Sequence, residues 1–378
     1  MKKTKIIAAL ALSVIATGAL SSCGGSKDID VALITDVGNI DDHSFNQTAW
    51  EGTVDFCEQK SLEYEYYRPS EDTDEARIAM MESAIEDGAD VLVLPGYLFE
   101  NATIELQTKY PNVKFLLLDG DLKGNHDVDP AANTACVIYK EEQPGFMAGY
   151  AAVMEGYTNI GFIGGMAVPA VIRFGHGYVA GANEAAKVLH AENPDFKLNI
   201  NYGYTGGFVP NDTVASNANA WFSSGVETIF VSGGKIYQSV LSAIESYPDA
   251  TMIGVDSDQG YESNRIITSA MKELHGTVVD SLTALWDAAP TLEDGSKDLA
   301  TAQWPSGIGA TLRNLGVESD AVGLAHGESW RLKNFTEEEY LDLYNKIKSG
   351  ELTVSVSSND QEHPTVEEYV TVDYTAYK

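Results

Sequence analysis

Cysteine, basic residues and long apolar runs are all scarce in this chain of 378 residues. Its three cysteines form no CxxC pair, so the spacing indicates neither a zinc site nor a thiol-redox motif. Lysine and arginine number 24 against 56 acidic residues, for a formal net charge of −32. This excess disfavours nucleic acid and anionic membranes as partners. After residue 22, no segment approaches the roughly 20 consecutive apolar residues that span a bilayer, so we expect a soluble body.

The N-terminus has the pattern of an export signal. Lys2, Lys3 and Lys5 precede an apolar stretch, residues 6–19, that is short for a membrane-spanning helix. The sequence Leu-Ser-Ser-Cys at 20–23 resembles the bacterial lipobox, in which the cysteine is acylated. We therefore predict a lipoprotein signal peptide at 1–22, lipidation at Cys23 and a tether at 23–28. The alternative is an ordinary cleavage site with an incidental cysteine.

The other two cysteines, Cys57 and Cys136, lie far apart in the sequence. Buried free thiols are the preferred interpretation, and a disulfide between them stays open. With about 350 residues after the signal peptide, the length favours two domains.

Short apolar runs that end in Gly or Asp recur along the chain. Runs of this length are typical of strands buried on both faces of a sheet. They begin at Val31, Val91, Phe115, Ile160, Thr228 and Met252.

Segments with helical punctuation lie between these runs. Ser44 and Gln47 have a capping-box spacing that predicts a helix to about Lys60, and Thr336 and Glu339 repeat that spacing near the C-terminus. A further helix is predicted from about Asp74 to Asp87, stopping at Gly88, and others after Glu141, Val168, Pro210 and Ile236. This alternation predicts an α/β fold with parallel sheets and right-handed crossovers.

The number of units exceeds one comfortable sheet, so we divide the chain into two lobes. We expect residues 29–138 and 256–300 in the first lobe, and residues 139–255 and 301–378 in the second.

Three aspartates follow predicted strands at the sheet edge where parallel α/β folds bind ligands: Asp36, Asp119 and Asp256. The sharpest local signal is TDVGNIDDHSFNQTAWEG at 35–52, which joins a strand end, a Gly turn, an acidic loop and a helix start. Asp36 and Phe45 could both face a ligand there. Equally, Asp36 could cap local backbone and Phe45 could be a core residue.

Other site types have weak support. Asp36, Asp41, Asp42 and His43 could suggest a metal, but calcium loops need a longer ligand series and zinc needs more His or Cys. SGGKIYQS at 232–239 lacks the spacing of a phosphate loop, and GFIGGMA at 161–167 lacks the full dinucleotide fingerprint. We expect no metal and no cofactor.

Segment 35–52 closely resembles the signature of the basic membrane protein family of lipoproteins, the purine nucleoside receptor type. The resemblance continues in order over roughly residues 30–280. Its further motifs are LLLDG at 116–120, EEQPGFMAGYAA at 141–152, IGFIGG with VPAVIRFGHGYVAGA, YTGGFVPNDT at 204–213, MIGVDSDQ at 252–259 and ITSAMK at 267–272.

The resemblance implies a two-lobed periplasmic-binding-protein fold of type I, in the sugar-binding subclass, and delivery of a nucleoside to an ABC-type importer. It implies that Asp36 and Asp119 contact the base, that Phe45 and Phe208 sandwich it, and that Asp256 and Lys272 bind the ribose hydroxyls. Asn46 and Tyr97 are weaker candidates that could be structural. His275 and Gly276 depart from the family's usual pattern after ITSAMK.

The chemistry of these side chains agrees with a nucleoside. Ionised carboxylates only accept hydrogen bonds, so they select N–H and O–H groups, and aromatic rings stack on a flat base. Several acids would repel a phosphate, so nucleosides should bind better than nucleotides.

Two alternatives belong to other classes. An enzyme such as a nucleoside hydrolase could use Asp36 and Asp119 as a carboxylate pair, although no G-x-S-x-G or HExxH motif supports catalysis. A surface lipoprotein that senses its ligand without feeding a transporter also fits.

Overall fold

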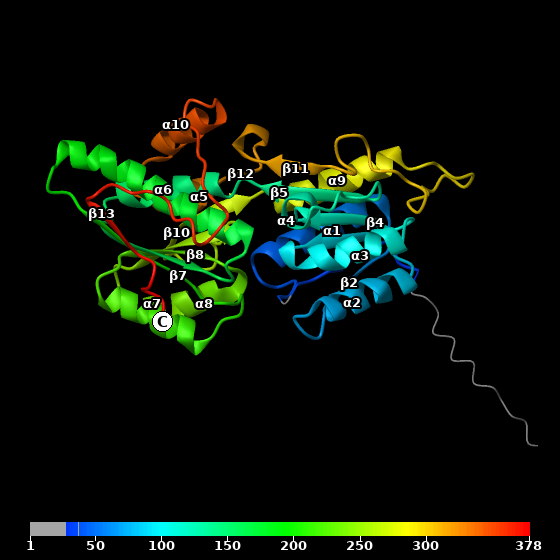
Figure 1. Cartoon of the computed structure of the whole chain (residues 1–378), viewed down its shortest axis with the longest axis horizontal. Coiled ribbons are helices and arrows are strands. Elements are labelled where there is room, and N and C mark those ends of the chain that lie inside the picture. The colour runs from blue at the N-terminus through cyan, green and yellow to red at the C-terminus, as the bar shows by residue number, and fades with distance from the viewer. Residues whose placement is uncertain (1–27, 37) are drawn as a thin grey trace, which may run out of the picture.

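The computed structural model describes residues 28–36 and 38–378, so the predicted signal peptide and Cys23 lie outside the described residues. Two sheets lie side by side, each with helices packed on it (Figure 1). The sheet of the first lobe has six strands in the order β11-β5-β4-β3-β1-β2. Their bounds are β1 Val31–Ile34, β2 Tyr64–Tyr67, β3 Val91–Pro95, β4 Lys114–Leu118, β5 Thr134–Tyr139 and β11 Leu312–Leu315. All five neighbouring pairs are parallel.

The sheet of the second lobe has seven strands in the order β12-β10-β9-β8-β6-β7-β13. Their bounds are β6 Asn159–Gly164, β7 Leu198–Tyr204, β8 Thr228–Ser232, β9 Thr251–Asp256, β10 Ile266–Lys272, β12 Val322–Leu324 and β13 Val370–Asp373. Its pairs are parallel except for β10 with β12. The expected α/β fold with two parallel-sheet lobes is confirmed, with this one antiparallel pair.

Helices cover both faces of each sheet, because side chains of alternate residues along a buried strand need apolar partners on opposite faces. In the first lobe, Leu33 packs with residues of α1, whereas Ile34 packs with residues of α2 and α3. In the second lobe, α5 and α6 cover one face, and α7 and α8 cover the other. The helix bounds are α1 Phe45–Lys60, α2 Asp74–Glu86, α3 Glu100–Lys109, α4 Leu122–His126, α5 Glu142–Met154, α6 Pro169–Glu192, α7 Asp212–Ser223, α8 Tyr237–Ile244, α9 Leu274–Ala288 and α10 Glu337–Lys348.

Two of the expected lobe boundaries are wrong. The chain returns to the first lobe after Lys272 rather than near Asp256, because β10 pairs with β9 in the second sheet. The loop between these strands folds back on its own lobe, where the Gln259 amide donates to Ser269 Oγ at 3.0 Å. Within the expected second-lobe segment 301–378, β11 instead pairs with β5 and covers an edge of the first sheet.

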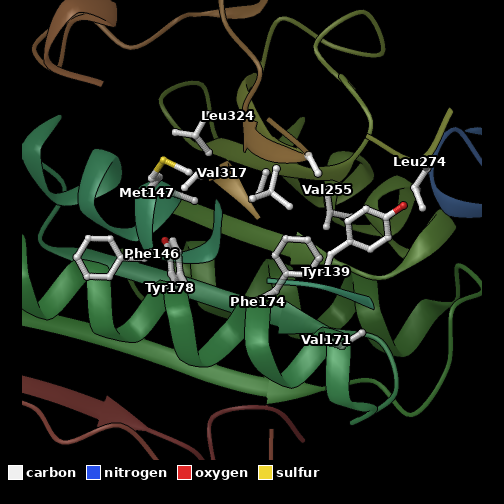
Figure 2. Close-up of a cluster of buried hydrophobic side chains, with 14 of the residues drawn as sticks. Tyr139, Phe146, Met147, Val171, Phe174, Tyr178, Val255, Leu274, Val317 and Leu324 are labelled. Carbon is white, nitrogen blue, oxygen red and sulfur yellow. The ribbon is translucent and has the colours of Figure 1, made fainter. Parts of the chain in front are cut away.

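The chain therefore crosses between the lobes three times, after β5, after β10 and after β11. Each crossing carries a buried apolar residue: Tyr139, Leu274 and Val317. Figure 2 shows these side chains in the same buried cluster as Phe174 and Tyr178 of α6, and this cluster joins residues of both lobes. The hinge is thus packed from three separate segments, which holds the carboxyl ends of the two sets of strands facing a common space.

Three smaller expectations are also settled. Thr336 and Glu339 form the predicted capping box at the start of α10. Cys57 and Cys136 are both buried free thiols, as preferred. In the described part of the chain, none of the helices is both long and apolar enough to span a membrane.

Candidate functional site

All eight side chains proposed from the sequence line one cavity of about 300 Å³, here called the interlobe pocket. The first lobe contributes Asp36, Phe45, Asn46, Tyr97 and Asp119, and the second contributes Phe208, Asp256 and Lys272. The two sets come from the carboxyl ends of β1, β3, β4, β9 and β10 or just after them, from the start of α1, and from the loop after β7. The geometry therefore brings together residues that are separated by more than 200 positions in the sequence.

Asp36 follows β1 and is held by two donors from its own lobe. Its Oδ1 accepts from the amide of Gly38 at 2.6 Å and from Asn46 Nδ2 at 2.9 Å. A side chain at Gly38 would place its Cβ 2.7 Å from Asn46 Nδ2, so it would displace the Asn46 side chain that holds Asp36. Burial raises the pKa of Asp36 to about 6, against the lowering effect of the Gly38 hydrogen bond. Asp36 is thus a partly buried carboxylate whose pKa is raised toward neutral pH.

The start of α1 differs from its predicted capping box. Ser44 makes no side-chain cap, and the carboxylate of Asp42 instead accepts from the amides of Ser44, Asn46 and Gln47 at 3.0 Å. The Ser44 hydroxyl instead points to the second lobe and donates to Asp256 Oδ2 at 2.7 Å. Asp42, which was expected to be a solvated acid, and Ser44, which was expected to cap the helix, thereby order the segment between Asp36 and Phe45.

Lys272 lies at the centre of a buried charge cluster. Its Nζ lies 2.5 Å from Asp119 Oδ2, 3.0 Å from Glu141 Oε1 and 3.8 Å from Asp256 Oδ1. Although burial lowers the pKa of Lys272, the three carboxylates raise it above the usual range for lysine. Lys272 stays protonated, and its contact with Asp119 joins the two lobes.

Glu141 and Arg173 belong to the same cluster, and the sequence-based reasoning did not single them out. Glu141 is fully buried, and its Oε2 accepts from Arg173 Nε at 2.5 Å. Burial raises the pKa of Glu141, but the nearby charges of Arg173 and Lys272 lower it by more than burial raises it. The pKa of Glu141 is therefore below its usual value. Both residues lie in motifs quoted for the family resemblance, at 141–152 and 168–182, but a motif by itself does not reveal which of its charged side chains point inward.

Asp119 and Asp256 leave β4 and β9 in the same unusual way. Both have a left-handed backbone, with φ of 57° and 63°, a conformation that aspartate tolerates better than most side chains. The Oδ1 atom of Asp119 is buried and has no hydrogen-bond partner among the described residues. Burial raises the pKa of Asp119 to about 7, although Lys272 lowers it. A buried oxygen without a donor is the feature expected where a ligand supplies the missing N–H or O–H.

Aromatic side chains enter the pocket from both lobes. The ring centre of Phe45 lies 5.0 Å from Lys272 Nζ, within the range of a cation–π contact. Phe208 packs against Gly165, where an added Cβ would meet its ring at 2.4 Å. Val168, Val171 and Phe174 add apolar surface. The pocket therefore combines flat apolar surfaces with oxygen acceptors, which suits a ligand that is flat at one end and rich in donors.

Asn46 and Tyr97 differ in how they are held. Asn46 donates to Asp36 and Asp42, and its Oδ1 accepts from the amide of Asp36 at 3.2 Å. This side chain is largely satisfied by the protein. Tyr97 begins a short 3-10 helix, Tyr97–Phe99, after the positive-φ Gly96, and lines the pocket.

At the mouth of the pocket, an exposed ion pair crosses between the lobes. Lys235 Nζ of the second lobe lies 2.7 Å from Asp41 Oδ1 of the first. The sequence-based reasoning treated Asp41 as a solvated acid and Lys235 only as part of a rejected phosphate loop.

Solved structures of two solute-binding proteins superpose on this chain over most of its length. A solute-binding protein of an ABC transporter system from Aeropyrum pernix superposes with a TM-score of 0.72 at 19% identity, covering 88% of this chain and 95% of that one. A solute-binding protein from Conexibacter woesei superposes with a TM-score of 0.62, also at 19% identity, covering 86% and 98%. The chain has the periplasmic-binding-protein fold.

Sequence relatives extend over nearly the whole chain. The "CD4+ T-cell-stimulating antigen" of Listeria monocytogenes is 26% identical over 380 residues, covering 94% of this chain and 99% of that protein. The "ABC transporter nucleoside-binding protein BmpA" of Lactococcus lactis is 28% identical over 350 residues, covering 84% and 91%. The profile of the Bmp family, described as ABC transporter substrate-binding protein PnrA-like, matches residues 29–358. This chain belongs to the Bmp family of ABC transporter substrate-binding proteins.

Proposed function

We propose that the protein binds a nucleoside, with a preference for purine nucleosides, in the interlobe pocket and delivers it to an ABC importer. The observation that carries this proposal is the convergence of eight side chains of suitable chemistry on one cavity of about 300 Å³. A relative that covers most of the chain is named for nucleoside binding. The comparisons give no support to the hydrolase alternative.

The roles we propose divide the ligand between the lobes. Phe45 and Phe208 stack on the base, and the carboxylates of Asp36 and Asp119 accept its N–H groups. Asp256 and Lys272 bind the ribose hydroxyls. Asn46 positions Asp36, because its side chain accepts from the Asp36 backbone amide and donates to the Asp36 carboxylate. Tyr97 borders the pocket near the base. No cofactor or metal has a part in this function.

Mass spectrometry of the ligand retained through mild purification tests this assignment, followed by calorimetric titration with guanosine, inosine and cytidine. We expect saturable binding that is tightest for the purine nucleosides. A protein that retains none of these and gives no titration heat would contradict the nucleoside assignment. Multiple-turnover release of free base would contradict binding without catalysis.

Affinity should depend on pH through Asp36. Its carboxylate is ionised above about pH 6 and accepts a hydrogen bond, and below that pH it becomes protonated. At pH 5 only about a tenth of the protein would carry the ionised form, so guanosine should bind about tenfold more weakly than at pH 8. Titrations at the two pH values measure this ratio. The Asp36→Asn variant should bind weakly and show a smaller pH dependence than wild type, with the remainder coming from Asp119, whose pKa burial raises to about 7. Equal wild-type affinities at both pH values would remove Asp36 from base recognition.

We also propose that the protein is exported and anchored to the outer face of the cytoplasmic membrane by lipid at Cys23. Because the tether precedes the folded lobes, Cys23→Ser should move the protein from the membrane fraction to the soluble fraction without changing its affinity for guanosine. Fractionation of expressing cells, with Cys57→Ser as the matched control, measures this. A Cys23→Ser protein that stays in the membrane fraction would exclude lipidation as the anchor.

A further inference from the structure

Two residues of the MIGVDSDQ motif, Ser257 and Gln259, are not needed by the proposed ligand contacts. They lie in the loop after β9 of the second lobe, and their side chains reach the first lobe. The backbone oxygen of His43 accepts from Ser257 Oγ at 2.9 Å and from Gln259 Nε2 at 3.0 Å. One carbonyl group of the first lobe thus receives two side-chain donors of the second.

Gln259 is firmly held on its own lobe. Its side chain is completely buried, its Oε1 accepts from the amide of Val255 at 3.1 Å, and its backbone amide donates to Ser269. The amide nitrogen Nε2 is therefore held in place and aimed at His43. When the lobes separate, this donor and the His43 carbonyl lose each other and must find water.

The residues before and after His43 in the sequence both contact elements that form the pocket. It has a left-handed backbone, with φ of 52°, and its amide donates to Gln47 Oε1 of α1 at 3.0 Å. Asp42 before it caps α1, and Ser44 after it donates to Asp256 in the pocket. Phe45, which follows Ser44 in the sequence, lines the pocket. The position of the His43 carbonyl therefore determines where the first-lobe pocket loop meets the second lobe.

We propose that His43, Ser257 and Gln259 form an interlobe clasp that holds the closed state and positions the two halves of the ligand site. In this role Ser257 and Gln259 are positioning residues, since they act through the His43 loop without touching the ligand. The clasp rests on the proposed function only for the identity of the ligand. The contacts that form it lie between the two lobes and do not involve the ligand.

Closure held in this way acts mainly on ligand release. Opening breaks both hydrogen bonds, whereas a ligand enters before they form, so loss of the clasp should speed dissociation more than it changes association. Gln259→Glu keeps the acceptor for Val255 but places a carboxylate oxygen against the His43 carbonyl. We expect guanosine to dissociate at least about tenfold faster, and about fivefold faster from Ser257→Ala, with association changed less than about threefold.

The matched control is Tyr261→Phe in the same loop. The Tyr261 hydroxyl lies 3.0 Å from His43 Nδ1, but the residue is 63% exposed, so the contact competes with water. This variant should release guanosine at close to the wild-type rate. Thermal melting of each ligand-free variant checks folding, and Ser257→Ala, which removes only a hydroxyl, serves if Gln259→Glu does not fold.

The experiment combines stopped-flow association and dissociation of guanosine with small-angle scattering of the ligand-free full-length protein. Faster release from both clasp variants but not from Tyr261→Phe would support the clasp, and wild-type release rates in both would overturn it. If the wild-type protein binds no guanosine, the proposed function fails separately. Scattering then decides: a larger radius of gyration for both clasp variants than for wild type supports the clasp, and an unchanged radius overturns it.

Discussion

Replacing Lys272 with methionine is expected to lower the free energy of unfolding by about 3–5 kcal/mol at pH 7, because it leaves buried carboxylates without their cation. Asp119 Oδ2 and Glu141 Oε1 lie 2.5 and 3.0 Å from the ammonium and have little access to water. Methionine preserves the length and the apolar part of the side chain, so the decrease in the free energy of unfolding measures the effect of removing the positive charge. Urea denaturation of the ligand-free protein measures it.

Lys235→Met is the matched control for this prediction. Lys235 also lines the pocket and pairs with an acid across the lobes, but its side chain is 28% exposed and that of Asp41 is 63% exposed. Solvent screens such a pair, so the control should lose no more than about 1 kcal/mol.

The effect of Lys272→Met should also depend on pH. Without the ammonium, burial keeps the pKa of Asp119 raised, and a carboxyl group whose pKa is raised in the folded state favours folding as pH falls. The variant should therefore be less destabilised at pH 5 than at pH 8. Equal stabilities of Lys272→Met and wild type at pH 8 would show that Lys272 does not neutralise the cluster.

Removing the ring of Phe208 should weaken binding of every nucleoside by a similar factor. Stacking of a base on an aromatic side chain contributes about 1–3 kcal/mol, which corresponds to roughly 5- to 150-fold in affinity. Because any flat base offers a ring face, Phe208→Ala should lower the affinities for guanosine, inosine and cytidine in parallel. Calorimetric titration of the three ligands provides the comparison.

Val209→Ala is the control for Phe208→Ala, since Val209 also lines the pocket but is 57% exposed. It should change each affinity by no more than a few-fold. Unchanged binding by Phe208→Ala would exclude stacking at this position. A loss confined to one base would indicate that Phe208 reads base identity rather than shape.

The elements that the sequence predicted well are those with a strong local signal. Continuous apolar runs such as VLVLP at β3 need burial on both faces, and only a central parallel strand supplies it. Thr336 and Glu339 form their capping box because both partners lie within one turn. In contrast, the edge strand β2, with the sequence YEYY and partly exposed side chains, lacked an apolar run and was missed.

The candidate site divides in the same way. Asp36, Asp119 and Asp256 could be proposed from the sequence because each lies at or just after the carboxyl end of a recognisable strand, and Phe45, Phe208 and Lys272 because they lie in motifs of a known family. Glu141 and Arg173 could not be assigned, because their roles depend on Lys272, which lies about 100 or more residues away in the sequence. The same holds for the contacts of Ser257 and Gln259 with His43.

By itself, therefore, the sequence determined the six core strands with continuous apolar runs, the α/β class and the chemistry available at the strand ends, all of which follow from interactions between near neighbours in the chain. It did not predict the buried strands β5 and β10. Only the tertiary structure decided that β10 and β11 belong to the lobes opposite to those expected, which buried charges pair, and how one lobe holds the other. Strand pairing and ion pairing of this kind join distant segments, and their energy depends on burial and on distances of a few ångströms that no local pattern records.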